Sequence, residues 1–120
     1  MKKYILLTFL TFSTSTYAFE LPSDDTLYTV GTLMIVADWA QTKQIARNPD
    51  RWDEINPILG EEPHPDRVDA YFAIATIGYN VVGRKFVNTP TKKVLYHGSI
   101  MLMQGWALTN NVSLGVRMKF

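Results

Sequence analysis

The positions of the prolines divide this chain into a small number of possible helices. Four prolines fall within residues 49–65, and another stands at Pro90. Because proline fits only the first turn of a helix, these positions leave three helix-length stretches, at about residues 26–46, 66–82 and 90–109. The sequence therefore predicts an all-α fold of three main helices, with a long Pro-rich connection between the first two.

Polar residues and a glycine mark the expected ends of the first two helices. Asp24 or Asp25 is expected to cap the first helix, since a carboxylate can accept hydrogen bonds from its free amides. Asp66, with Asp69 three residues later, forms a pattern similar to a capping box. Gly83 is expected to end the second helix, because glycine commonly follows the last helical turn.

The third helix and the tail have equally distinct signals. Thr89 can cap the third helix and Pro90 fits its first position. Asn110 and Asn111 are expected to form the turn that ends it. Residues 112–120 then alternate apolar with small or polar side chains, which is typical of a strand. We therefore expect a short extended C-terminal tail.

The N-terminus resembles a secretory signal peptide. Lys2 and Lys3 precede the apolar residues 4–12, and a polar, small-residue segment leads to Ala18. We expect residues 1–18 to be the signal peptide, cleaved after Ala18, and residues 19–120 to form a single small helical domain. An uncleaved anchor is the alternative. The chain has no cysteine, so it has no disulfide to compensate for its small core.

Charge is distributed unevenly. Every acidic residue lies at or before Asp69, whereas the connection between the second and third helices is basic, with Arg84, Lys85, Lys92 and Lys93. Four cations are too few to predict nucleic-acid binding. A membrane surface is a more natural counterpart for an exported chain.

The apolar parts of the second and third helices allow two interpretations. Each is about sixteen residues long, short of the ~20 that a straight transmembrane helix needs. A hairpin spanning the membrane would leave the basic connection in the cytoplasm, as the positive-inside rule prefers. Gly98, Ser99 and Gly105 would then allow close helix contacts. A water-soluble three-helix bundle is the alternative.

Polar side chains gather at particular positions. Asp38, Gln41 and Thr42 have the i, i+3, i+4 spacing that places them on one helix face. A buried carboxylate there needs hydrogen-bond partners, so we interpret this face as a polar brace. The remaining members of the predicted binding or structural cluster are a compact turn and two residues of the later helices: Glu54, Asn56, Pro57, Gly60, Asn80 and His97.

Recognisable catalytic and cofactor motifs are absent from the sequence. There is no nucleophile elbow, P-loop or dinucleotide fingerprint. His64 and His97 lack the paired spacing of a zinc site, so we predict no metal and no cofactor. We assign no catalytic residue, although Asp38 or Glu54 could serve a periplasmic enzyme.

Three motifs of the chain resemble a family of small exported proteins of unknown function, frequent in phages and prophages of Gram-negative bacteria. The likeness rests on Asp-Trp-x-Gln-Thr at residues 38–42, Glu-x-Asn-Pro-Ile-Leu-Gly at residues 54–60, and Val68-x-x-Tyr71-Phe72. The final Gly115-Val116-x-x-x-Phe120 also fits. The resemblance implies helices, export and an envelope location, but no reaction.

These observations together favour a non-enzymatic, membrane-associated protein of the Gram-negative cell envelope, and the resemblance implies that it is phage or prophage encoded. Its expected place is the periplasm or inner membrane rather than the outer membrane. The expected partner is a membrane or an envelope protein, with a homo-oligomer also open and no nucleic acid. A carboxylate enzyme and a soluble periplasmic binding module remain alternatives.

Overall fold

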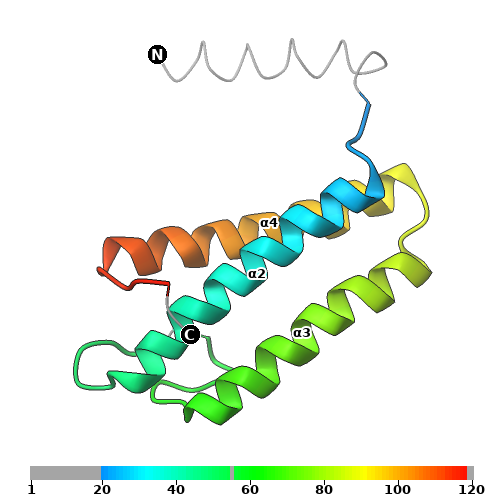
Figure 1. Ribbon diagram of the computed structural model, residues 1–120. Helices are drawn as coiled ribbons and strands as arrows, with labels where there is room; N and C mark the ends of the chain where they lie inside the picture. Colours follow the sequence, from blue (N-terminus) through cyan, green and yellow to red (C-terminus); the bar gives the residue numbers. More distant parts are fainter. Residues whose placement is uncertain (1–19, 55, 119–120) are drawn as a thin grey trace, which may run out of the picture.

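A computed structural model describes residues 20–54 and 56–118 of the chain. Three helices, α2 (Asp24–Arg47), α3 (Pro65–Phe86) and α4 (Pro90–Ser113), account for nearly all of its regular structure (Figure 1). The predicted all-α fold with three main helices is therefore confirmed. The predicted signal peptide, residues 1–18, lies outside the described residues.

The helices begin at caps that were only partly predicted. Ser23, rather than Asp24 or Asp25, caps α2 and accepts a hydrogen bond from the Thr26 amide. His64, rather than Asp66, caps α3: its Nδ1 accepts from the Asp66 amide. Thr89 caps α4 as predicted, accepting from the amide of Lys92.

Two of the predicted helix ends are wrong. Gly83 lies inside α3, which continues to Phe86. A Cβ at Gly83 would come within 2.5 Å of the Tyr28 hydroxyl and 2.6 Å of the Tyr96 ring. Gly83 therefore serves helix packing rather than helix termination. Gly98, for which we expected close packing, has open space instead, and a Cβ at Gly105 would make only ordinary contact with Met34.

The second wrong end concerns α4. This helix runs through Asn110 and Asn111 to Ser113, and the described residues contain no strand. Gly115, with a φ of 82°, turns the chain after the helix. Tertiary hydrogen bonds explain the longer helix, because the Asn111 side chain is buried and bonded to α2. The described part of the tail ends at residue 118.

The core is built mainly by α2 and α3. Its buried residues come from these two helices and the connection between them: Tyr28, Ile35, Leu59, Val68, Phe72 and Tyr79. Val68 is completely buried. Gly31 and Gly83 allow α2 and α3 to approach closely, since a Cβ at Gly31 would meet the ring of Tyr79 and one at Gly83 would meet Tyr28. Trp39 of α2 stacks on Phe72 of α3 with a centroid distance of 6.2 Å.

The third helix, α4, is attached differently. It packs against α2 and has little contact with α3 beyond the end at which the two are joined. Its buried side chains within the described residues are His97 and Asn111, and both are polar. Tyr96 and Ile100 contribute partly buried apolar contacts to the core. Hydrogen bonds near the two ends therefore fix the position of α4.

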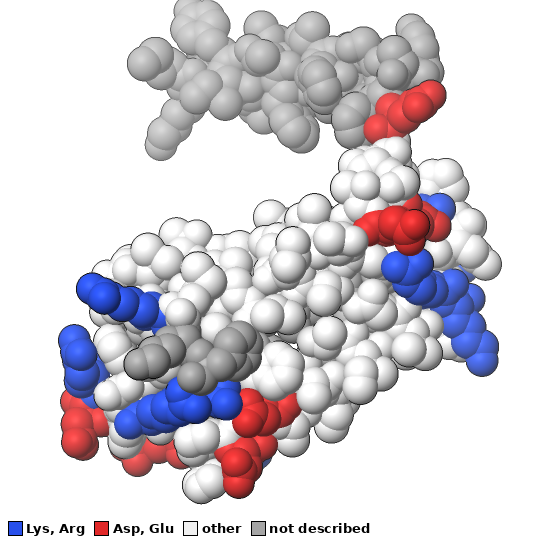
Figure 2. All heavy atoms as spheres, viewed as in Figure 1, with Lys and Arg blue, Asp and Glu red and all other residues white. Residues whose placement is uncertain are grey.

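Large apolar side chains are exposed on both α3 and α4. On α3 they recur with helical spacing at Ile74, Ile77 and Val81, and on α4 at Leu102 and Trp106. Figure 2 shows a broad uncharged surface between charged groups at the two ends of the molecule. The described helices include none that is both long and apolar enough to cross a lipid bilayer.

Candidate functional site

The polar face predicted on the first helix exists and is buried. Asp38, Gln41 and Thr42 have exposed fractions of 9%, 1% and 1%. The Thr42 hydroxyl donates to Asp38 Oδ1 over 3.3 Å. Asn111 of α4 donates its side-chain amide to Gln41 Oε1 at 3.0 Å and to Asp38 Oδ1 at 3.4 Å. The face therefore braces α2 against α4.

The surroundings of the Asp38 carboxyl group disfavour its ionised form. Burial, first, and the nearby Glu54 carboxylate raise the pKa of Asp38 from 3.8 to about 6, although the hydrogen bonds from Thr42 and Asn111 act in the opposite direction. No cation is among these groups. Asp38 is therefore in a setting that favours its neutral form or a positively charged neighbour.

The Asn-Pro turn has the geometry expected from its sequence. Asn56 Oδ1 accepts from the Ile58 amide over 3.0 Å, and the Asn56 carbonyl accepts from Leu59 and Gly60. Gly60 has a φ of 85°, a left-handed conformation that suits glycine. Glu54 is buried and accepts from the Asn56 amide at 2.9 Å. The turn thus fixes the Glu54 carboxylate beside α2.

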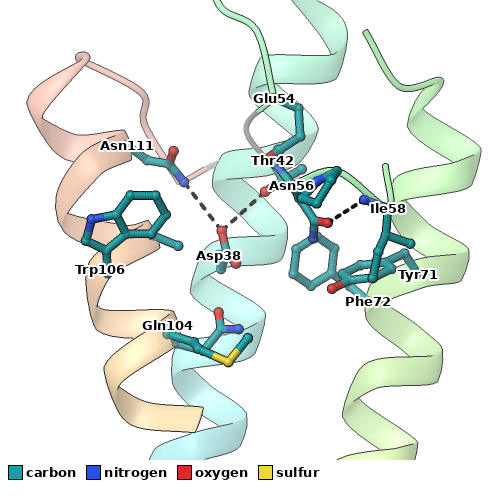
Figure 3. A pocket seen from close by; sticks show the side chains of 13 residues that line it. Asp38, Thr42, Glu54, Asn56, Ile58, Tyr71, Phe72, Gln104, Trp106 and Asn111 are labelled. Atoms are coloured by element: carbon teal, nitrogen blue, oxygen red, sulfur yellow. Dashed lines mark hydrogen bonds between the residues drawn. The ribbon is translucent and has the colours of Figure 1, made fainter. Parts of the chain in front are cut away.

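A cavity of about 360 Å³ joins the turn to the polar face. Figure 3 shows Asp38 between Asn111 on one side and the rings of Tyr71 and Phe72 on the other. The cavity is lined by thirteen residues from all three helices and the turn: Asp38, Thr42, Glu54, Asn56, Pro57, Ile58, Tyr71, Phe72, Met103, Gln104, Trp106, Ala107 and Asn111. Its lining is largely apolar, with two carboxyl groups.

Two members of the predicted cluster lie elsewhere. His97 Nδ1 is 2.6 Å from the hydroxyl of Tyr79, which also donates to the carbonyl of Leu27. Asn80 donates to the Thr32 hydroxyl. Burial lowers the pKa of His97, so its neutral form is favoured. These residues hold α2, α3 and α4 together and are not part of the cavity.

Another contact corrects the role predicted for Asp69. Instead of completing a helix cap, its carboxylate accepts from Trp39 Nε1 at 2.8 Å and pairs with Lys43 at 3.2 Å. The bond from Trp39, together with Lys43, lowers the pKa of Asp69. Asp69 therefore links α3 to α2.

Sequence reasoning missed the α4 side of the site. The sequence predicts Asn111 as a turn residue, and Met103 and Trp106 give no signal of a cavity. Gln104 was noticeable only as a polar residue within an apolar stretch.

For a metal, the described residues offer no group of three or more histidine, cysteine, aspartate or glutamate side chains. Comparison with protein-family models, curated proteins and solved structures finds no match to this chain.

Proposed function

We propose that this is a non-enzymatic protein of the cell envelope that is exported and associates with a membrane surface through α3 and α4. The observation that carries the proposal is the apolar surface that the fold leaves uncovered. Ile74, Ile77 and Val81 on α3 are 71%, 63% and 61% exposed, and Leu102 and Trp106 on α4 are 77% and 65% exposed. Contiguous exposed apolar surface is typical of a binding face.

Charge at the joined end of α3 and α4 supports a lipid surface as the counterpart. Arg84 and Lys93 are paired with Asp25 and Asp24 of α2. Lys85 and Lys92 are exposed, and Phe86 beside them is 59% exposed. Cations next to apolar side chains suit an anionic membrane surface, where the apolar groups enter the headgroup region.

Vesicle co-sedimentation tests this function. The chain from Phe19 onward keeps every contact described above and omits the apolar leader. We expect it to sediment with vesicles containing phosphatidylglycerol and less with phosphatidylcholine alone. The double substitution Ile77→Ser and Val81→Ser should weaken binding, whereas Leu33→Ser, an exposed residue of α2, should change it little. Equal binding by all three proteins, or none to either vesicle, would refute the proposal.

A carboxylate enzyme is the second candidate. The raised pKa of Asp38 favours it, because perturbed carboxyl groups in cavities are common in active sites. Structural networks shift pKa values as well, and the hydrogen bonds of Asp38 to Thr42 and Asn111 have a clear structural role. Loss of a measured activity in Asp38→Asn, with the fold preserved, would favour the enzyme.

The family resemblance supports a proposed origin and cellular location for the protein. Residues 38–42, 54–60 and 71–72, which carry the resemblance, supply much of the cavity and of the turn beside it. We therefore propose a phage or prophage origin and a periplasmic or inner-membrane location. Fractionation of a Gram-negative host expressing the full chain tests the location, and recovery in the cytosol would contradict it.

A further inference from the structure

The cavity beside Asp38 exists because α3 and α4 do not pack against each other along their length. α3 and α4 both pack against α2 but make little contact with each other. Apolar side chains from the turn, α3 and α4 surround the resulting space, among them Ile58, Phe72 and Met103. Its volume of about 360 Å³ is within the range of roughly 300–1,000 Å³ that is usual for small-molecule sites.

The ionisable carboxyl groups of the cavity can carry only negative charge. Asp38 and Glu54 are both more than nine-tenths buried. The described lining includes no lysine, arginine or histidine. The side-chain oxygen of Gln104, also in the lining, is buried and accepts no hydrogen bond from the described protein. The interior therefore offers negative charge and oxygen acceptors, and a complementary ligand would supply positive charge and N–H donors.

The walls of the cavity set a second requirement for a ligand, namely an apolar body. The lining exposes mainly apolar area, to which the aromatic rings of Tyr71, Phe72 and Trp106 contribute. Ring faces attract organic cations, and apolar walls favour an apolar ligand body. A bare divalent cation would gain nothing from these walls and would find only two carboxyl groups. Both requirements are met by an ammonium group attached to a hydrocarbon chain.

We propose that the cavity between α2, α3 and α4 binds an organic ammonium ion with an apolar body, its charged group beside Asp38 and Glu54 and its hydrocarbon against Met103 and Trp106. This inference goes beyond association with a membrane surface and does not depend on it. Lipid binding requires the outer faces of α3 and α4, whereas ammonium binding requires the carboxyl groups inside the cavity; Trp106 belongs to both surfaces.

Isothermal titration of the chain from Phe19 onward with three matched compounds tests the proposal. Octylammonium, octanol and octanoate share a chain length and differ in charge. At pH 7.5 we expect octylammonium to bind at least about tenfold more tightly than the other two, because it alone can donate a charge-assisted hydrogen bond to a carboxylate. Asp38→Asn should abolish this preference and leave the weak binding of octanol unchanged.

Two further variants separate the cavity from the outer surface. Ala107→Phe places a ring in the cavity and should reduce octylammonium binding without changing vesicle binding. Glu62→Gln removes an exposed carboxylate and should change neither. The proposal is overturned if octanol or octanoate binds as tightly as octylammonium, if no compound binds, or if folded Asp38→Asn retains the preference. Circular dichroism of each variant confirms that the helices are intact.

Discussion

Asn111, in the last turn of α4, donates its side-chain amide to Gln41 of α2 over 3.0 Å, and both side chains are buried. A polar pair thus holds the end of a helix that has few buried apolar side chains. Removing one partner from a buried pair leaves the other unsatisfied, which costs about 1–3 kcal/mol.

Asn111→Ala should therefore lower the free energy of unfolding by about 2 kcal/mol. It should also increase hydrogen exchange in the last turns of α4, since Asn111 is the buried contact nearest that end. Denaturant titration and amide exchange measure the two effects. Asn110→Ala, at the partly exposed neighbouring position, is the matched control. Equal stability of the two variants would contradict a bracing role for Asn111.

Asp38 should make the protein less stable as the pH rises. Its pKa is about 6 in the folded protein and has an ordinary value of 3.8, so between these values the folded state binds more protons than the unfolded state. Its contribution to stability is therefore greatest at low pH and is lost as the pH rises through 6. The free energy of unfolding of Asp38→Asn, relative to that of the wild type, should be about 2 kcal/mol higher at pH 7.5 than at pH 4.5.

Denaturant titrations of both proteins at the two pH values measure this difference. Comparing the variant with wild type at each pH cancels the contribution of other groups, including His97, whose lowered pKa acts in the opposite direction. A difference that is independent of pH would show that the folded protein does not perturb Asp38.

Gly83 and Gly98 form a natural matched pair for helix packing. Both lie inside helices, but a Cβ at Gly83 would collide with Tyr28 and Tyr96, whereas Gly98 faces open space. Gly83→Ala should destabilise the protein by about 1–3 kcal/mol through overpacking. Gly98→Ala should be neutral or stabilising by up to about 1 kcal/mol, because alanine favours the helix. Thermal unfolding distinguishes them, and the opposite order would contradict the packing of α3 on α2.

His97 should be neutral, with its proton on Nδ1. Tyr79 donates to the Leu27 carbonyl, so its oxygen is free to accept from Nδ1–H at 2.6 Å. Nε2 is then a buried acceptor, in agreement with its lack of a partner among the described residues. Nitrogen NMR shifts of the imidazole identify the tautomer. A proton on Nε2, or a pKa above the ordinary value, would contradict this arrangement.

Local signals predicted the helices better than their ends. Thr89 and Pro90 act within one turn of the backbone, so their effect could be recognised without the fold. The positions of Gly83 and Asn111 depend on tyrosine rings and a glutamine in other helices. A local signal for termination was overridden there by contacts between distant segments.

The candidate site shows the same division. Helical spacing predicted that Asp38, Gln41 and Thr42 would share a face, and turn chemistry predicted the role of Asn56. Nothing in the local sequence could show that Trp106 would lie beside them, because that depends on how α4 crosses α2. The predicted cluster includes His97 because of its residue type alone, and the fold places His97 beside Tyr79, away from the cavity.

Site-specific labelling tests whether α3 and α4 contact a membrane surface. The chain has no cysteine, so a single introduced cysteine can carry an environment-sensitive fluorophore. We would compare Ile77→Cys on α3, Leu102→Cys on α4 and Thr29→Cys at an exposed position of α2. On vesicles containing phosphatidylglycerol, the fluorophore emission should shift to shorter wavelength at positions 77 and 102 and remain unchanged at position 29. An unchanged emission at either α3 or α4, or the same shift at all three positions, would contradict the account.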